Sequence, residues 1–248
     1  MVGKLKKVDY LAQSGILQFS VLSLDFMDTI YKDSIHCNFF SLPSFSPFPL
    51  ILMELLKRIF FSFQMLHRYR HALAKIYHNN PHNVQLRQIS PAILKQKGIA
   101  VLVLDFDGVL AAHGEPYPVE ELHDWLNECI STFGSTQIFI LSNKPLQNRI
   151  TYFNQYYQGV RYIAEVKKKP YPDGLQKIMV LTGQSSETLM LVDDRLLTGG
   201  LAACIANVPM IYITRPYVLL SKRPLQELFF MMLRFVERRF IQLYSWLR

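Results

Sequence analysis

Four short apolar runs, separated by segments with helical periodicity, constrain the fold of this chain more than any other feature. The runs are IAVLVL (99–104), QIFILS (137–142), LMLVD (189–193) and PMIYIT (209–214). The segments predicted as helices between them are 118–132, 145–157 and 172–182. Uninterrupted apolar strands that alternate with helices are typical of sheets covered on both faces. The pattern predicts an α/β fold, a Rossmann-like three-layer sandwich around a mostly parallel central sheet.

Polar side chains stand at the carboxyl ends of several of these runs, where open parallel sheets bind their ligands. They are Asp105 and Asp107 after the first run, Ser142 and Asn143 at the end of the second, and Asp193 and Asp194 at the end of the third. One acidic pair is compatible with an ordinary turn that happens to hold two acids. Acidic pairs at two strand ends favour a functional site instead.

Charge repulsion indicates what such acids hold. Two carboxylates about 4 Å apart repel by roughly 4 kcal/mol at an effective dielectric constant of about 20. Either a cation lies between them or one is protonated, and hard oxygen ligands suit Mg²⁺. Lys169, in the loop VKKKPYPDG (166–174), can bring positive charge to the acids or to a bound phosphate. The Ser142 hydroxyl and the Asn143 amide can donate to phosphate oxygens, although Ser142 also suits a structural cap.

The intervals between these residues leave no room for a large cap domain. The stretch from Asp107 to Ser142 is 35 residues long and is taken up mostly by one helix and one strand. The stretch from Ser142 to Lys169 is 27 residues long and holds a helix and a short strand. A site without a cap is open to bulky substrates, such as a phosphate on a macromolecule or on a lipid headgroup.

Four segments together carry a resemblance to a known family. They are GIAVLVLDFDGVL, IFILSNKPLQNRITYF, KKKPYPDGL and LMLVDDRLLTGG. The order of DxD, Ser, Lys and DD resembles the haloacid dehalogenase (HAD) superfamily of phosphohydrolases, subclass IIIA. Within it, residues 84–240 are similar to the YqeG-like, phosphatidylglycerophosphate phosphatase branch.

The resemblance implies a Mg²⁺-dependent phosphomonoester hydrolase that works through a phosphoaspartate. Asp105 would be the nucleophile. Asp107 would protonate the leaving alcohol and then act as the base for water. Ser142, with Asn143 beside it, would hydrogen-bond the transferring phosphoryl group, and Lys169 would neutralise its charge.

The same resemblance implies a metal site and also shows departures from the branch. Asp194, with Asp193 as a further candidate, would hold Mg²⁺ together with Asp105 and the backbone carbonyl of Asp107. The branch commonly has an acidic residue where this chain has Gly199, and glycine where this chain has Asp193. These departures motivate an alternative, a HAD-fold binding or regulatory protein with weakened catalysis.

The distribution of charge along the chain indicates which surfaces and substrates the protein can bind. The net charge is +7 for residues 1–99, −4 for residues 100–214 and +5 for residues 215–248. Basic ends around an acidic middle indicate contact with an anionic surface, or simply solvated helix faces. We expect a phosphorylated substrate, an anionic lipid among the candidates, and peripheral membrane contact. Phosphatases of soluble small molecules or of nucleic acid remain alternatives, with nucleic acid disfavoured because no readout module is recognisable.

Three parts are expected along the chain. Residues 1–48 form an extension of uncertain order, residues 49–83 an amphipathic basic helical segment, and residues 84–248 the hydrolase domain with a last helix at 223–247. Both end helices either pack on the domain or lie in a membrane interface. The apolar run at 48–66 is interrupted by charges, so it is not expected to span a membrane. Three cysteines without pairing spacing favour a reducing, cytoplasmic location, with peripheral contact at the inner membrane face.

Overall fold

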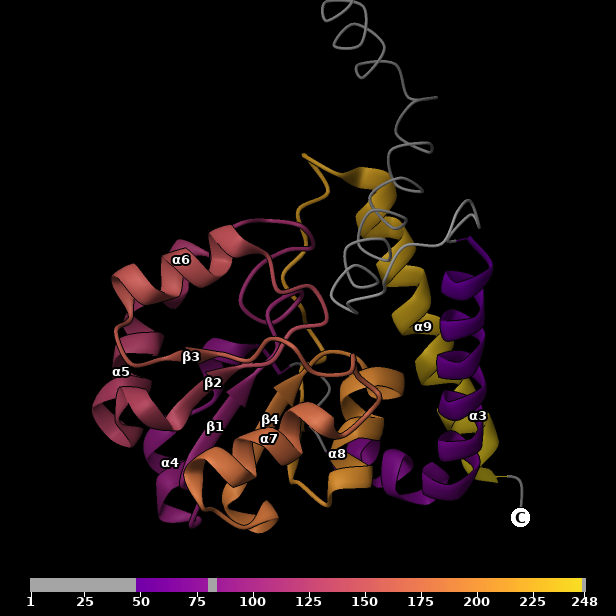
Figure 1. Ribbon diagram of the computed structural model, residues 1–248, viewed down its shortest axis with the longest axis horizontal. Coiled ribbons are helices and arrows are strands. Elements are labelled where there is room, and N and C mark those ends of the chain that lie inside the picture. Colours follow the sequence, from indigo (N-terminus) through magenta and orange to yellow (C-terminus); the bar gives the residue numbers. More distant parts are fainter. Residues whose placement is uncertain (1–47, 80–83, 247–248) are drawn as a thin grey trace, which may run out of the picture. The chain divides into compact units, whose positions relative to one another are not determined.

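The computed structural model describes residues 48–79 and 84–246, and it contains a five-stranded parallel sheet in the order β3-β2-β1-β4-β5 (Figure 1). The strands are β1 (Val101–Leu104), β2 (Ile138–Ile140), β3 (Arg161–Tyr162), β4 (Leu189–Asp193) and β5 (Met210–Tyr212). Every strand pair is parallel, so the predicted sheet is confirmed. The expected extension at 1–48 lies almost wholly outside the described residues.

Helices cover both faces of this sheet, as a three-layer sandwich requires. Helices α4 (Pro91–Gln96), α5 (His123–Phe133) and α6 (Gln147–Tyr156) cover one face, and α7 (Asp173–Thr182) and α8 (Leu201–Ala206) cover the other. Strand β1 divides its side chains between them, since successive residues of a strand point to opposite faces. Leu102 and Leu104 pack with the first set of helices, and Val101 and Val103 pack with the second. All four side chains are completely buried.

The helix boundaries follow local backbone chemistry. Helix α5 begins at His123 rather than at 118, because the preceding residues include Pro116 and Pro118 and form only a 3₁₀ turn at Glu120–Leu122. Helix α7 ends at Thr182, because the next residue, Gly183, has the left-handed φ of +66° that glycine adopts without strain. Helices α4 and α8 were not predicted, because six residues are too few to show a helical period.

No separate cap domain interrupts the sheet, in agreement with the short intervals. Between Asp107 and Ser142 the chain forms α5, two short 3₁₀ turns and β2. Between Ser142 and Lys169 it forms α6 and the expected short strand, β3. Neither of these two intervals therefore inserts a domain over the carboxyl ends of the strands.

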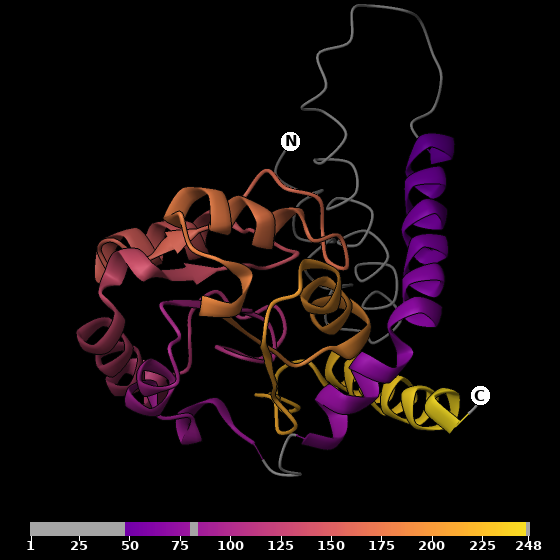
Figure 2. The ribbon, with the colours of Figure 1, turned by 90° about the horizontal axis from the view of Figure 1, so that it is seen from below.

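The first and last elements among the described residues are helices α3 (Phe48–Asn79) and α9 (Pro224–Trp246). Residues 60–248 belong to one compact unit, in which the 60–79 part of α3 lies beside α9 in both views (Figures 1 and 2). Leu66 and Leu73 of α3 pack there in one cluster with Leu201 and Ile241. The turns of α3 up to Ile59 belong to the other unit of the chain. Within residues 48–79 and 84–246, no helix has both the length and the apolar character that crossing a membrane demands.

Candidate active site

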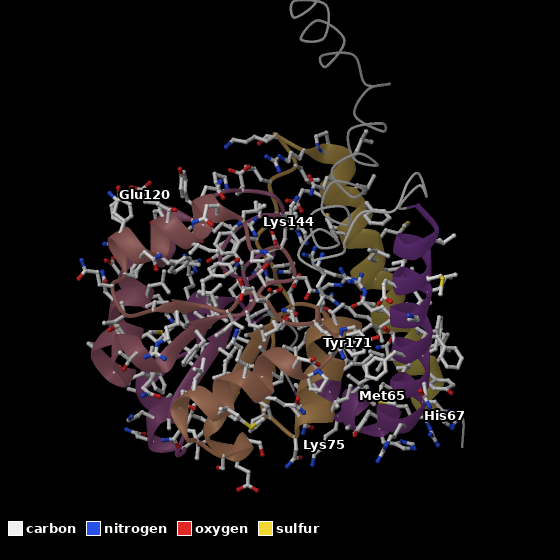
Figure 3. The ribbon with its side chains drawn as sticks, viewed as in Figure 1. Met65, His67, Lys75, Glu120, Lys144 and Tyr171 are labelled. Atoms are coloured by element: carbon white, nitrogen blue, oxygen red, sulfur yellow. The ribbon has the colours of Figure 1, made fainter. Side chains whose placement is uncertain are left out.

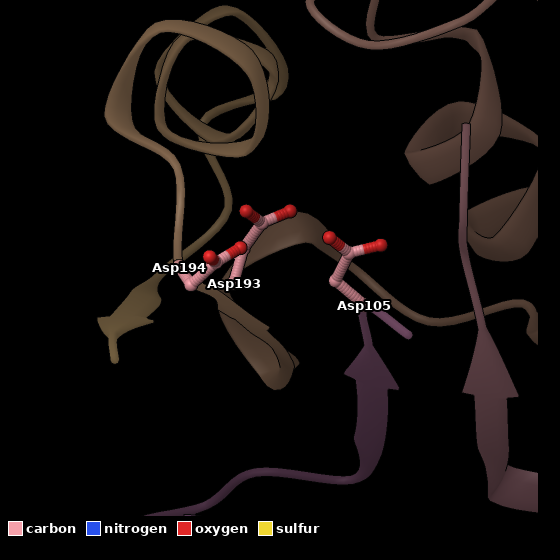
Figure 4. Close-up of side chains that lie close together, drawn as sticks. All are labelled: Asp105, Asp193 and Asp194. Atoms are coloured by element: carbon pink, nitrogen blue, oxygen red, sulfur yellow. The ribbon is translucent and has the colours of Figure 1, made fainter. Parts of the chain in front are cut away.

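Three of the predicted acids meet at the carboxyl ends of β1 and β4. The Asp105 N–H extends the ladder between these adjacent strands by donating to the Val192 carbonyl, at 2.9 Å. This pairing brings Asp105 beside Asp193 and Asp194, and one carboxylate oxygen of each lies within 4.8 Å of the others (Figure 4). All three side chains are buried.

Lys169 supplies the positive charge expected beside these acids. Its Nζ lies 2.9 Å from Asp105 Oδ1 and 2.5 Å from Asp193 Oδ2, and only 3% of the residue is exposed. Asn143 fixes the lysine from the neighbouring loop, because its Oδ1 accepts from the Lys169 N–H at 2.7 Å and its Nδ2 donates to the Lys169 carbonyl at 3.2 Å. In this structure the Asn143 amide therefore holds the lysine, and its expected contact with phosphate stays a prediction.

The pKa shifts reflect three buried acids around one lysine. Burial raises the pKa of Asp105 to about 8, although Lys169 works against this rise. Burial likewise raises the pKa of Asp193. Burial alone would lower the pKa of Lys169, but the carboxylates of Asp105 and Asp193 raise it overall. The three carboxylates outnumber the two cations that bind them, Lys169 and Arg234, so the cluster favours a further cation.

Asp193 is fully engaged by protein groups. Besides Lys169 at one oxygen, its Oδ1 accepts from the Arg195 N–H at 2.9 Å. A Cβ on Gly199 would lie 2.2 Å from the Asp193 Cγ, so only glycine leaves room for this carboxylate. The two departures from the branch, Asp193 and Gly199, are therefore in direct contact in space.

Asp194 has one oxygen engaged and one free. Its Oδ2 accepts from Arg234 Nε at 2.6 Å, while its Oδ1 is buried without a hydrogen-bond partner among the described residues. Gly108, at a φ of +84°, permits this approach, because a Cβ there would lie 2.4 Å from Asp194 Oδ2. A buried, unpaired carboxylate oxygen beside two further carboxylates fits a hard divalent cation such as Mg²⁺.

Asp107 lies apart from this group and has its own partner. Arg149 binds its carboxylate with two hydrogen bonds, of 2.8 and 2.9 Å, and the Gly114 N–H donates to it at 3.1 Å. Burial works to raise the pKa of Asp107, but Arg149 lowers it overall. The Asp107 side chain is not among the clustered acids, and the metal contact expected through its backbone carbonyl stays a prediction.

Ser142 follows β2 at the same edge of the sheet. The Leu141 N–H donates to the Leu104 carbonyl at 2.9 Å, which sets the end of β2 beside the end of β1. The Ser142 Oγ is buried and accepts from the N–H of Lys144, at 3.1 Å; Lys144 is labelled in Figure 3. This is the turn contact of a structural cap, and a hydroxyl that accepts one bond can still donate its own proton.

Sequence reasoning missed the arginines and glutamates that surround the site. Helix α9 turns three of its charged residues inward. Arg234 binds Asp194, and Glu237 binds the Arg195 guanidinium. Glu227 accepts a hydrogen bond from the His113 N–H at 3.1 Å. These three side chains are almost completely buried. Their spacing of 227, 234 and 237 places them on one helix face, which was the available signal.

A Rossmann-like parallel sheet with DxD, Ser, Lys and DD at successive strand ends defines the class as a HAD-type phosphohydrolase. The family described as "Mitochondrial PGP phosphatase" matches residues 69–216, which is more than half of the chain, and the chain belongs to this family. It is a family of phosphoric monoester hydrolases, and its description implies a phosphorylated lipid as substrate. The match begins inside α3 and ends before α9.

The chain was also compared with solved structures and with curated proteins. The crystal structure of an uncharacterized protein from Corynebacterium glutamicum is similar over 56% of this chain and 97% of its own, with 18% sequence identity and a TM-score of 0.37. No curated protein matches the chain.

Proposed function

We propose that this protein is a Mg²⁺-dependent phosphatase that removes the phosphate from phosphatidylglycerophosphate, or a similar lipid phosphate, at a membrane surface. The observation that carries the proposal is the contact of Lys169 with Asp105 and Asp193, next to Asp194, at the ends of two adjacent strands. This arrangement sets a nucleophile, a positive charge and hard metal ligands within one buried cluster.

Asp105 is the proposed nucleophile. Phosphate monoesters are among the slowest substrates to hydrolyse, requiring accelerations of up to about 10²¹-fold. Attack by the Asp105 carboxylate forms a phosphoaspartate and breaks the bond to the alcohol, and water then cleaves the phosphoaspartate, so one difficult step becomes two. Lys169 neutralises charge on the transferring group, since an anionic nucleophile must approach an anionic phosphate.

The metal is proposed to be held by Asp194 and Asp105, with Asp193 at the edge of the site. The free Oδ1 of Asp194 supports this assignment. Mg²⁺ bound there would supply positive charge against the phosphate oxygens. Asp193, whose two oxygens already bind Lys169 and Arg195, acts mainly through the lysine in this proposal.

Asp107 is proposed to act first as the general acid and then as the general base. It protonates the leaving oxygen of the alcohol during attack by Asp105, and it then takes a proton from the water that hydrolyses the phosphoaspartate. Its separation from the clustered acids agrees with this division of work, because the leaving group lies opposite the nucleophile in an in-line transfer.

The outer face of α9 supports a membrane-bound substrate. Large apolar side chains are exposed along it, including Leu228, Phe229, Met232, Phe235 and Leu243. Arg239 is an exposed basic residue of the same helix, and a basic residue near an anionic surface contributes roughly 1 kcal/mol. The family's description favours a mitochondrial membrane as this surface, and the cytoplasmic location expected from the cysteines stays a prediction.

The test compares phosphate release from phosphatidylglycerophosphate in mixed micelles with release from soluble sugar phosphates, with and without Mg²⁺. The proposal expects Mg²⁺-dependent release that favours the lipid and that Asp105→Asn abolishes. Preference for the sugars would contradict the lipid assignment. No release from either substrate would favour the alternative of a binding or regulatory protein, which Asp193 and Gly199 first suggested.

A further inference from the structure

A pocket separate from the acidic cluster opens between the loop that follows β1 and the segment that precedes α9. Its volume is about 300 Å³, which is at the lower end of the range for sites of small molecules. The loop after β1 contributes residues 112 and 115–119, and the segment before α9 contributes residues 217–219. Alanine, proline, valine, leucine and tyrosine make up this lining apart from one glutamate, so the pocket suits an apolar ligand.

The pocket is joined to the active site by backbone hydrogen bonds. On one wall, the Tyr217 N–H donates to the carbonyl of Gly108, at 2.9 Å, and Gly108 directly follows Asp107. On the other wall, the N–H of Gly114, which precedes Glu115, donates to Asp107 Oδ1 at 3.1 Å. Both walls are thus anchored to the turn at the end of β1. A long substrate with its phosphate at the acidic cluster can therefore extend into the pocket.

The same pocket is joined to α9 through Leu219. The Leu219 N–H donates to Glu227 Oε1 at 3.3 Å, and the Leu219 carbonyl accepts from the Arg223 N–H at 3.3 Å. The first turns of α9 then present the exposed apolar side chains of Leu225 and Leu228. The pocket is therefore fixed to the active-site turn on one side and to the helix proposed to contact the membrane on the other.

The lining favours a hydrocarbon chain over a second phosphate. Glu115 is the charged residue of the lining, and its carboxylate accepts from Lys222 Nζ at 3.3 Å. A carboxylate repels a phosphate, whereas the ring of the exposed Tyr117 offers an apolar body with a polar tip, as suits the entrance of an apolar site. Each CH₂ group that leaves water for such a pocket strengthens binding about fourfold.

We propose that this pocket binds the first part of an acyl chain of the lipid substrate. The loop after β1 and the segment before α9 then form one specificity element, which selects a lipid phosphate over a soluble phosphate. The inference rests on the proposed function, which places the phosphate of that lipid at the acidic cluster. It adds a site for the hydrocarbon part of the substrate, at a distance from the reacting atoms.

The test measures kcat/KM for two substrates with the same headgroup. One is dihexanoyl phosphatidylglycerophosphate, used below the concentration at which it forms micelles, so that membrane binding by α9 does not contribute. The other is the same compound without its acyl chains. Val218→Trp, which fills the pocket, should lower kcat/KM for the acylated substrate by about 15- to 60-fold, the effect of expelling two or three CH₂ groups. It should leave kcat/KM for the deacylated substrate unchanged.

Leu220→Trp is the matched control, because Leu220 is exposed and lies just outside the lining. It should leave kcat/KM for both substrates unchanged. If Val218→Trp does not fold, Val218→Ala decides instead. This variant enlarges the pocket and should raise the preference for dioctanoyl over dihexanoyl chains.

Three results would overturn the inference and leave the proposed function intact. They are equal losses of Val218→Trp on both substrates, an unaltered chain preference of Val218→Ala, and an unchanged protein that hydrolyses the acylated and deacylated substrates equally well. Failure of the unchanged protein to hydrolyse either substrate would overturn the proposed function and this inference with it.

Discussion

The carboxylate of Asp193 occupies the space that a side chain at Gly199 would need, since a Cβ on Gly199 would lie 2.2 Å from the Asp193 Cγ. In its present position, Asp193 therefore requires glycine at position 199. Because Gly199 leaves this space free, the Asp193 carboxylate at the end of β4 accepts a hydrogen bond from Lys169. The glycine that suggested weakened catalysis is, in this structure, a condition for the Asp193–Lys169–Asp105 contacts.

Gly199→Ala is expected to displace Asp193 and to lower the free energy of unfolding by about 1–3 kcal/mol, the usual cost of overpacking. Urea denaturation measures this difference. Gly200→Ala is the control, because its Cβ would lie 3.1 Å from the end of the Leu73 side chain and 3.6 Å from the end of the Leu196 side chain. A Gly199→Ala protein as stable as the Gly200→Ala protein would show that the Asp193 carboxylate can move aside freely.

Arg234→Met should leave Asp194 buried with a single negative charge and no partner at Oδ2. Breaking a buried ion pair costs about 3–5 kcal/mol, and we expect a loss in that range from urea denaturation. Added Mg²⁺ should restore part of the stability, because a ligand that binds only the folded state stabilises it. Arg239→Met, at an exposed position of the same helix, should have little effect. Equal stability of the two variants would contradict the importance of the Arg234–Asp194 contact.

The lowered pKa of Glu227 predicts that the stability of the protein depends on pH. Burial works to raise its pKa, but the His113 ring and the N–H groups of His113 and Leu219 lower it overall, below its ordinary value of 4.5. A lowered pKa in the folded state means that the stabilisation is complete above about pH 4.5 and is lost as the pH falls through the folded pKa. Glu227→Gln should therefore flatten the acid side of the stability curve. Glu120→Gln, at the exposed position labelled in Figure 3, should leave the curve unchanged.

The outer face of α9 is expected to bind anionic vesicles. Phe229→Ser and Phe235→Ser each remove an exposed ring, at little cost to folding. Each should weaken vesicle binding by roughly 10- to 150-fold, because burying such a ring contributes about 1.5–3 kcal/mol. Flotation with vesicles of anionic and of neutral lipids measures the effect. Val180→Ser, which removes an exposed apolar side chain from α7, is the matched control. Unchanged binding in both phenylalanine variants would remove α9 from the membrane contact.

The sequence predicted the sheet and the residues at its strand ends, because both depend on local patterns. Uninterrupted apolar runs mark buried parallel strands, and the carboxyl ends of adjacent strands must meet, so Asp105 and Asp194 could be brought together from the sequence alone. The role of Lys169 was expected from its loop and from the resemblance, and in the structure its Nζ lies 2.9 Å from Asp105 Oδ1.

The arginines around the site could not be predicted in the same way. Arg149 contacts Asp107 across 42 positions of the chain, and Arg234 contacts Asp194 across 40. A side chain on a helix gives no indication of which distant loop it meets. Charged residues are compatible with a solvated helix face, whereas tertiary packing buries Glu227, Arg234 and Glu237 of α9 and leaves apolar side chains exposed.

The most direct test of the account is to trap the phosphoryl group on the enzyme. The protein is mixed with phosphatidylglycerophosphate and Mg²⁺, quenched in acid within its first turnovers, digested, and analysed by mass spectrometry. We expect one added phosphoryl group on the peptide that contains Asp105, and none in the Asp105→Asn protein. Phosphate release at an undiminished rate from Asp105→Asn, or a phosphoryl group on another residue, would contradict it.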